Sequence, residues 1–188
     1  MYNNKKYIAS YLKEVKQICD ALDQDKILKF ANLLNDLKGR CFILGVGGSA
    51  ANASHLVNDL RKICKIDALT PLDNISELTA RINDDSWDTS LSETLKISNL
   101  NENDCIIILS VGGGSNHTSK NLVEAMNLAK QQGTKILSIV SRDGGTAKIL
   151  SDVCILIPTI QEKRITAHAE EFQGVLWHLI VNLIEECC

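Results

Sequence analysis

Residues 40–55 read Arg-Cys-Phe-Ile-Leu-Gly-Val-Gly-Gly-Ser-Ala-Ala-Asn-Ala-Ser-His, an apolar run that ends in a Gly/Ser-rich turn ahead of a helix. The run is continuously apolar, which is the pattern of a strand buried on both faces of a parallel sheet. Glycines after such a strand let the backbone approach an anion, and the following helix offers free N–H groups. The stretch therefore predicts a strand, a ligand-binding turn and a helix in succession.

Three further apolar runs, at 105–109, 135–140 and 153–157, share this character. Stretches with helical spacing separate them, such as Leu122, Ala125, Met126 and Ala129. Strands that alternate with helices predict an α/β fold with a mainly parallel sheet flanked by helices.

Residues 3–38, ahead of the first strand, read as an N-terminal helical pair with apolar stripes. We expect a helical hairpin, with two roles left open: an oligomer interface, or a cover for one face of the sheet. A length of 188 residues predicts a single domain, with helices over 1–38 and an α/β core over 39–188.

The composition excludes several classes of protein. Charged residues make up 23% of the chain and the net charge is −3, which argues against a disordered tail and against broad binding to nucleic acid. No apolar run approaches the roughly 18 residues of a membrane span, and the N-terminus lacks the apolar core of a signal peptide. We therefore expect a cytoplasmic protein with no membrane partner.

Two more loops resemble the first in composition and position. Ser110-Val-Gly-Gly-Gly-Ser115 follows the second apolar run, and Ser141-Arg-Asp-Gly-Gly145 follows the third. Since ligands of open α/β sheets bind beyond the carboxyl ends of the strands, these loops should converge on one crevice. Each could be an ordinary tight turn, but two Gly/Ser loops together favour a phosphate site.

A dinucleotide site is the main competitor. Gly45-x-Gly47-x-x-Ala50 fits the dinucleotide fingerprint, and Asp67 lies near the position of a ribose-binding acid. Residues 62–69, however, make a poor second strand, and the fingerprint does not explain the serines of the second loop. Sugar phosphate thus ranks above nicotinamide, and we expect no nucleotide cofactor.

Two helices carry polar groups in suggestive positions. His55 and Asp59 are four residues apart and share a helical face. Glu170 and His178 share a face of the last helix, two turns apart. Each also has a purely structural interpretation: a solvated histidine, a core histidine, or a glutamate near a helix N-terminus. The residues alone do not place both sets in one pocket.

The run from Gly45 to His55, the second loop, Arg142-Asp-Gly-Gly145 and the terminal Glu-Glu-Phe-Gln-x4-His178 together resemble the sugar isomerase (SIS) superfamily. More narrowly, they resemble the phosphoheptose isomerases. The resemblance implies a three-layer SIS fold and an aldose–ketose isomerase that converts sedoheptulose 7-phosphate to D-glycero-D-manno-heptose 7-phosphate, for bacterial lipopolysaccharide or capsule. It also implies a homotetramer with active sites at subunit interfaces.

Site residues follow from the same resemblance. Asp59 and His178 take the catalytic positions. Zinc, which some members bind, would be held by His55, Asp59, Glu170 and His178. The positions implied for substrate binding are Gly47, Gly48, Ser49, Asn83, Asp84, Ser110, Gly112, Gly113, Gly114, Ser115, Asp143 and Glu170.

The chain departs from the family at three points. Asp59 stands where the family has Glu, and Glu170 where it has Gln. The second loop, usually Ser-x-Ser-Gly-Asn-Ser, has Gly112 in place of a serine and a short insertion at 116–118. Phosphate contacts are then expected from Ser49, Ser110, Ser115 and backbone N–H groups.

Isomerisation would move a proton between adjacent carbons through an enediol, with Asp59 and His178 as base and acid in either order. Zinc could instead polarise the carbonyl, which conflicts with free acid–base roles for the same side chains. A non-catalytic alternative is a sugar-phosphate sensor or a replication-initiation scaffold on the same fold.

Overall fold

The apolar runs of the sequence form the strands of one parallel sheet in the computed structural model, which describes residues 4–187. The strands are β1 (Cys41–Gly45), β2 (Ala68–Leu69), β3 (Cys105–Leu109), β4 (Lys135–Val140) and β5 (Val153–Leu156). The helices are α1 (Lys5–Ala21), α2 (Gln24–Asn35), α3 (Gly48–Lys62), α4 (Ile75–Asp84), α5 (Ser90–Ile97), α6 (Lys120–Gln131), α7 (Gly145–Leu150) and α8 (Ile165–Cys187).

The strand order is β2-β1-β3-β4-β5, and every neighbouring pair is parallel. The chain therefore moves outward in one direction to β2 and in the other from β3 onward. Such a switch point opens a crevice outside the carboxyl ends of β1 and β3, where ligands of doubly wound sheets bind. The fold thus directs attention to the loops that follow β1, β3 and β4.

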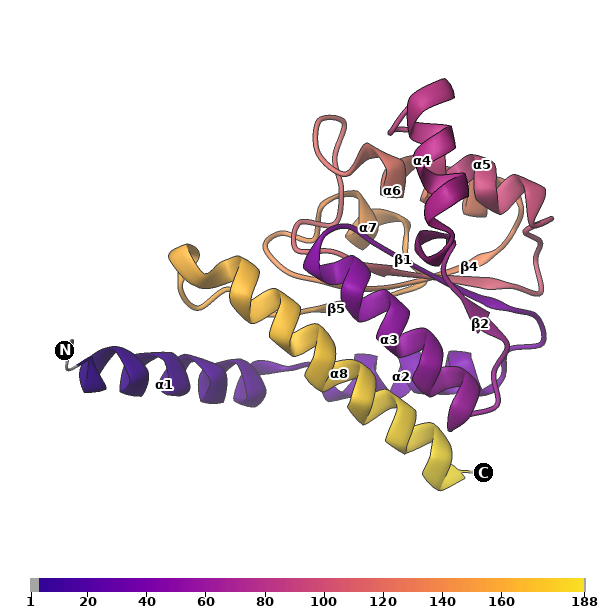
Figure 1. Ribbon diagram of the computed structural model, residues 1–188. Helices are drawn as coiled ribbons and strands as arrows, with labels where there is room; N and C mark the ends of the chain where they lie inside the picture. Colours follow the sequence, from indigo (N-terminus) through magenta and orange to yellow (C-terminus); the bar gives the residue numbers. More distant parts are fainter. Residues whose placement is uncertain (1–3, 188) are drawn as a thin grey trace.

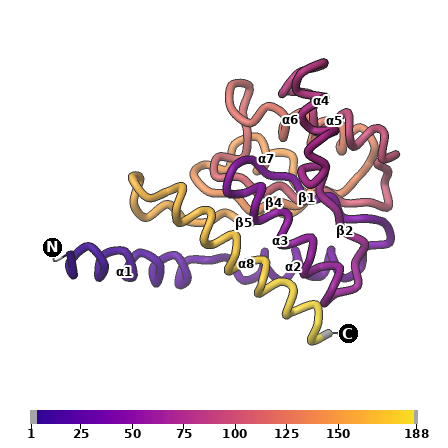
Figure 2. Tube along the Cα trace, in the orientation of Figure 1, coloured from indigo at the N-terminus to yellow at the C-terminus, as the bar shows by residue number. Residues whose placement is uncertain are grey.

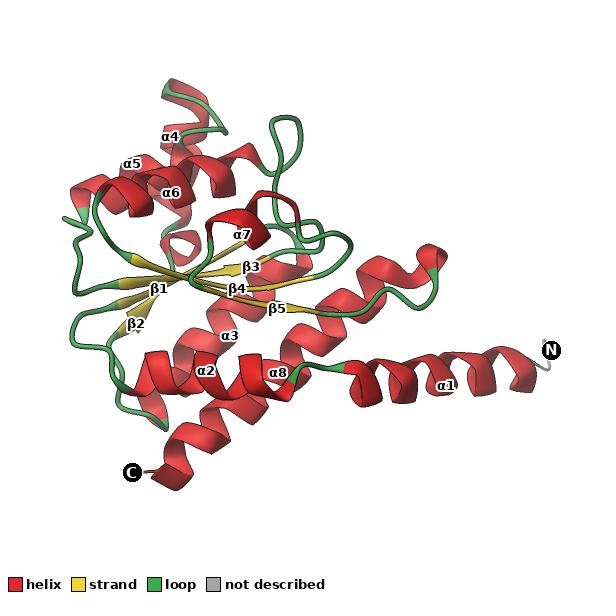
Figure 3. Ribbon diagram, turned by 180° about the vertical axis from the view of Figure 1, so that it is seen from behind, coloured by secondary structure: helices red, strands yellow, loops and turns green. Residues whose placement is uncertain are grey.

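Successive strand residues face opposite layers, as the pleat requires. Cys41 and Ile43 pack with α2, α3 and α8, whereas Phe42 and Leu44 pack with α5, α6 and α7. Figure 3 shows the sheet between these two layers. The expected α/β fold, with helices on both faces of a parallel sheet, is confirmed.

The edge strand β2 was not expected, because residues 62–69 make a poor strand by their sequence. Ala68 and Leu69 pair with Cys41 and Phe42 of β1. Two residues are too few to produce a recognisable apolar run, so the pairing is set by the neighbouring strand.

The N-terminal helices do not form the expected hairpin. The backbone of Leu22, between α1 and α2, is extended (φ −68°, ψ 137°) and does not reverse the chain. α2 packs on α8 and β5, so it covers one face of the sheet, while α1 reaches away from the body (Figures 1 and 2).

Among residues 4–187, the helices include none with the length and hydropathy that a bilayer crossing requires.

Candidate active site

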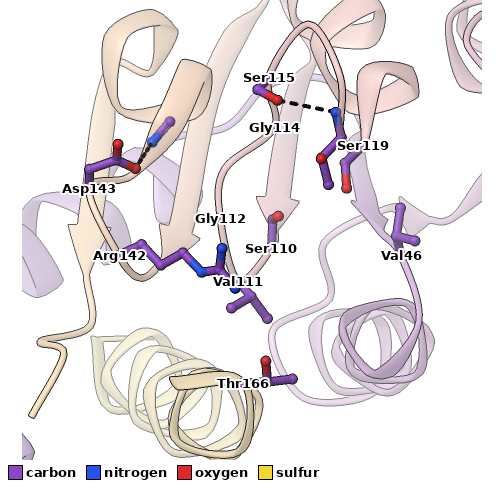
Figure 4. A pocket seen from close by; sticks show the side chains of 12 residues that line it. Val46, Ser110, Val111, Gly112, Gly114, Ser115, Ser119, Arg142, Asp143 and Thr166 are labelled. Atoms are coloured by element: carbon purple, nitrogen blue, oxygen red, sulfur yellow. Dashed lines mark hydrogen bonds between the residues drawn. The ribbon is translucent and has the colours of Figure 1, made fainter. Parts of the chain in front are cut away.

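A cavity of about 600 Å³ lies outside the carboxyl ends of the central strands. The loops after β3 and β4 form most of its wall, with Val46 after β1 and Thr166 at the start of α8 (Figure 4). Its lining consists of Val46, Ser110, Val111, Gly112, Gly114, Ser115, Thr118, Ser119, Arg142, Asp143, Gly145 and Thr166. Hydroxyl groups and glycine backbone dominate this wall, so it suits a ligand rich in hydrogen-bonding oxygens.

Close backbone contacts fix the β3 and β4 loops to each other. Gly113 has a φ of +72°, and a Cβ at this position would lie 2.0 Å from the carbonyl oxygen of Gly144. The N–H of Ala147 donates to the carbonyl of Gly113 (2.9 Å), and that of Thr146 donates to Gly114 (3.0 Å). Glycine at 113 therefore lets two loops pack at backbone distance, which shapes the cavity before any ligand binds.

The serines of the second loop are held by its own backbone. Ser110 Oγ accepts from the N–H of Gly113 at 3.1 Å. Ser115 Oγ accepts from the N–H groups of His117 and Thr118 at 3.2 and 3.1 Å. Each hydroxyl then has its proton left to donate to a bound oxygen anion.

The cavity contains some of the expected substrate-binding residues and not others. It includes Ser110, Gly112, Gly114, Ser115 and Asp143. The β1 loop contributes only Val46.

Three expected residues of the β1 loop lie outside the cavity lining. Gly47 and Gly48 are exposed, and Ser49 is buried with no hydrogen-bond partner for its Oγ. The carboxylate of Glu170 lies against Gly48, so negative charge already sits at this end of α3.

Asn83 and Asp84 also lie away from the cavity lining. Both are exposed at the end of α4, where the Asn83 amide donates to the Asp84 carboxylate at 2.7 Å. The chain returns toward the cavity just afterwards: Asp88 pairs with Lys120, next to the lining residue Ser119, at 2.9 Å.

Several lining residues were not among the site residues expected from the sequence. Ser119 directly precedes a helical stretch, and Arg142 belongs to the Arg-Asp-Gly-Gly turn that the sequence analysis quoted. The sequence around Ser119 and Arg142 could therefore have identified them as candidate binding residues. No sequence feature marks Val46 or Thr166, because only the fold brings them to the cavity.

A second cluster, His55, Asp59 and His178, lies where α3 and α8 pack together. Asp59 Oδ2 lies 3.7 Å from His55 Nε2 and 3.6 Å from His178 Nε2. The Asp59 side chain is 10% exposed, whereas the His55 and His178 side chains are 57% and 52% exposed. The fold thus brings the two helical motifs together and leaves the imidazoles open to solvent.

Hydrogen bonds and ring contacts orient these side chains. His178 Nδ1 lies 2.7 Å from the carbonyl of Gly174, which can only accept, so the Nδ1 carries the proton. When the ring is neutral, its lone pair is on Nε2, which faces Asp59 and can take a proton or bind a metal. Asn58 donates to Asp59 Oδ1 at 2.9 Å, and Trp177 contacts both imidazoles edge-on at 4.5 Å.

The donor set of this cluster fits zinc. Its three ligand atoms lie within 4.8 Å of one another. Ligands at tetrahedral corners, 2.0–2.2 Å from zinc, are about 3.3–3.6 Å apart, close to both Asp59 distances. Three protein ligands with an open fourth position are the pattern of a catalytic zinc site.

Glu170 is not part of this group. The two helices run side by side (Figure 1), with Glu170 against Gly48 and His178 against Asp59. Between these levels, Asn52 donates to Gln173 Oε1 at 3.0 Å. Glu170 and His178 are separated by roughly 12 Å along α8, so within one chain the structure brings together three of the four expected ligands.

The cavity and the cluster are likewise at different levels of α3. Gly48 begins α3 two residues after the lining residue Val46, whereas Asp59 lies 11 positions further on, roughly 16 Å along the helix axis. One chain therefore holds the Gly/Ser-rich loops and the cluster of His55, Asp59 and His178 in separate places.

A charged network fixes the start of α8, which carries Thr166 into the cavity. His168 is buried, with Nε2 2.9 Å from Glu14 of α1 and Nδ1 beside Glu171. Burial opposes the charged ring, but the hydrogen bonds to Glu14 and Glu171 outweigh it and raise the pKa of His168. Hydrogen bonds from Arg164 and His168 lower the pKa of Glu14 to about 2.

Comparison with known proteins supplies a family. Residues 7–141 match the model of the SIS domain. A phosphoheptose isomerase from Helicobacter pylori (strain Shi470) is 32% identical over 188 residues, which cover 96% of this chain and 93% of that protein.

Two solved structures share the fold over almost their whole length. The phosphoheptose isomerase from Neisseria gonorrhoeae superposes with a TM-score of 0.85 at 22% identity, covering 97% of this chain and 99% of the other. The phosphoheptose isomerase from Francisella tularensis gives 0.84 at 20% identity, covering 99% and 100%.

Proposed function

Because this chain belongs to the SIS domain family and, within it, to the phosphoheptose isomerases, we propose that it interconverts sedoheptulose 7-phosphate and D-glycero-D-manno-heptose 7-phosphate. The reaction is an aldose–ketose isomerisation, an intramolecular oxidoreduction in bacterial heptose biosynthesis. The observation that carries the proposal is the cavity at the carboxyl ends of the strands, whose hydroxyls and loop backbone suit a sugar phosphate. The charge of that phosphate retains the substrate in the cytoplasm, where we place the reaction.

The chemistry requires one proton to move between neighbouring carbons. A base removes a proton from C1 of the ketose, the C1–C2 double bond of an enediol forms, and the carbonyl oxygen at C2 takes up a proton. Protonation of C2 and loss of the proton on O1 then give the aldehyde. Each half needs one group that accepts a proton and one that donates it.

We assign these roles to Asp59 and His178. Their facing atoms are 3.6 Å apart, so both can reach one end of a small substrate. Burial of Asp59 and its bond from Asn58 hold the carboxylate in place, while Gly174 keeps the His178 Nε2 available. Either residue can start the transfer.

His55, Asp59 and His178 would hold the zinc that some family members bind, and a bound zinc ion supplies Lewis-acid polarisation of a carbonyl. The roles of Asp59 and His178 as proton carriers belong to the metal-free enzyme, since a ligand lone pair is not available to a proton.

We further propose a homotetramer whose active sites lie at subunit interfaces. The separation of cavity and cluster along α3 supports this arrangement, because loops from one copy can meet the cluster of another. Subunit mixing tests it: an Asp59→Ala chain, impaired in proton transfer, and a Gly113→Ala chain, impaired in loop packing, should be more active when co-assembled than either is alone. Mixed assemblies that are no more active than either variant alone would contradict a shared site.

The activity itself is tested by incubating the purified protein with sedoheptulose 7-phosphate and with unphosphorylated sedoheptulose. We expect heptose phosphate from the first and no product from the second, since the phosphate supplies the energy of orientation. Binding of the phosphorylated sugar without turnover would favour the sensor alternative.

A further inference from the structure

Arg142 is a charged residue of the cavity lining that has no role in the proposed mechanism. It follows β4 in the turn Ser141–Gly145, and its backbone has a φ of +55°, a conformation that non-glycine residues seldom adopt. Figure 4 shows its side chain crossing the cavity toward Val111. The turn thus aims a cation into the space between the loops.

The guanidinium has no protein partner among residues 4–187. The other arginines, Arg40, Arg61, Arg81 and Arg164, each form an ion pair with a carboxylate. Arg142 forms neither an ion pair nor a hydrogen bond. Its five donors face the cavity unpaired.

The surroundings of Arg142 favour an anion. Asp143 is the other charged residue of the lining, and its Oδ1 accepts from the N–H of Gly145 at 3.1 Å, which turns it toward the backbone. The remaining polar groups of the wall include the hydroxyls of Ser110, Ser115 and Ser119. A cation together with several hydroxyl donors is complementary to a group with several anionic oxygens.

Gly112 makes room for this side chain. A Cβ at position 112 would lie 3.8 Å from Arg142 Cδ, the separation of an ordinary van der Waals contact. The aliphatic part of Arg142 therefore lies over a residue with no side chain of its own. A serine fits at 112 without displacing the arginine, which allows a test by rescue.

We propose that Arg142 binds the phosphate group of the substrate and supplies the charge that selects phosphorylated over neutral sugars. The inference rests on the proposed function for the identity of the sugar, but not for the anion. A planar guanidinium binds phosphate through two parallel hydrogen bonds, which a lysine or a hydroxyl cannot reproduce.

The test measures binding of inorganic phosphate to the full-length protein by isothermal calorimetry, and KM for the sugar phosphate alongside. Arg142→Gln should weaken phosphate binding roughly ten- to a hundredfold and raise KM with a smaller change in kcat. Lys148→Gln is the matched control, because it removes a nearby cation that does not line the 600 Å³ cavity. It should leave both values within about twofold, since surface charges act weakly.

Adding Gly112→Ser to Arg142→Gln should recover part of the lost phosphate affinity, because the new hydroxyl enters the space that Arg142 leaves. Wild-type phosphate affinity in Arg142→Gln, an equal loss in Lys148→Gln, or no phosphate binding by the wild type would overturn the proposal. Phosphate binding through Arg142 without isomerisation of the heptulose phosphate would contradict the proposed substrate alone. Circular dichroism of each variant separates loss of binding from loss of fold.

Discussion

The loop cavity and the helix cluster differ in how the chain builds them. The cavity is made by backbone: Gly113 meets Gly144 at contact distance, and hydrogen bonds join the two loops. The cluster is made by side chains on two packed helices, and its imidazoles are more than half exposed. Residues of one chain form the cavity, whereas the cluster is open to solvent in the single chain.

This difference separates two tasks. Anchoring a phosphate needs fixed donors, which rigid loops provide without further ordering. Proton transfer needs groups that can reach the substrate, and we propose that the exposed imidazoles reach it when the surface of another subunit closes over them. We therefore expect substitutions in the cluster to lower kcat. Substitutions in the loops should weaken substrate binding and lower the free energy of unfolding.

The largest effect should come from the cluster. Asp59→Ala and His178→Ala should each lower kcat by roughly 10²- to 10⁴-fold, the usual contribution of an acid or base, with the oligomeric state unchanged. Steady-state kinetics and gel filtration measure both. Asn182→Ala, one turn beyond His178 on the same helix, serves as the control and should retain activity. Near wild-type turnover in either cluster variant would remove that residue from the mechanism.

Substitutions in the loops should lower the free energy of unfolding. Gly113→Ala places a Cβ 2.0 Å from a backbone oxygen at a positive φ, and we expect a loss of roughly 2–4 kcal/mol in urea unfolding. Gly47→Ala is the matched control: its φ is also positive, but no atom lies within 4 Å of the added Cβ. That variant should lose only the conformational cost, roughly 1–2 kcal/mol. Equal losses in both variants would mean that loop packing contributes nothing.

Zinc affinity should depend on the cluster alone. His55→Ala should weaken zinc binding at least roughly tenfold, while Glu170→Gln should leave it unchanged, since Glu170 lies beside Gly48. Competition with a chromogenic chelator gives both affinities. A large loss in Glu170→Gln would show that the fourth expected ligand reaches the metal in the assembled protein.

The smallest effect should come from the network at the start of α8, which joins the two regions. The pKa of His168 is raised in the folded state, so its contribution to stability is complete below its unfolded value of about 6.5. That contribution is lost as the pH rises through the folded pKa. The thermal unfolding temperature should fall as the pH rises from 6 to 9. His168→Gln should abolish this fall, whereas His117→Gln, a control in an exposed loop, should retain it. A pH dependence unaltered by His168→Gln would contradict the charged ring.

The sequence predicted the core well because its signals are local. Runs such as 105–109 must be strands buried on both faces, and their loops must then meet at one edge of the sheet. β2 escaped notice because two residues make no pattern, and the helical hairpin was wrong because the extended backbone at Leu22 sets the direction of α1.

The site was predictable as two motifs but not as a geometry. The spacing of His55 and Asp59 fixed their common face, and the resemblance paired them with His178. Helix spacing also indicated that Glu170 and His178 would not share one metal site. They share a face of α8 but are two turns apart, so Glu170 lies against Gly48 and His178 lies near Asp59 of α3. The role of Arg142 was inferred because its guanidinium has no carboxylate partner in the fold. No sequence pattern could indicate this.

One spectrum tests the central claim most directly: proton NMR of sedoheptulose 7-phosphate incubated with the enzyme in D₂O. Transfer through an enediol predicts an aldose anomeric signal together with replacement of a C1 proton of the ketose by deuterium. Both changes should be at least roughly 10²-fold slower with Asp59→Ala or His178→Ala. A spectrum that stays unchanged with the wild-type protein would contradict the assignment of this chain as a phosphoheptose isomerase.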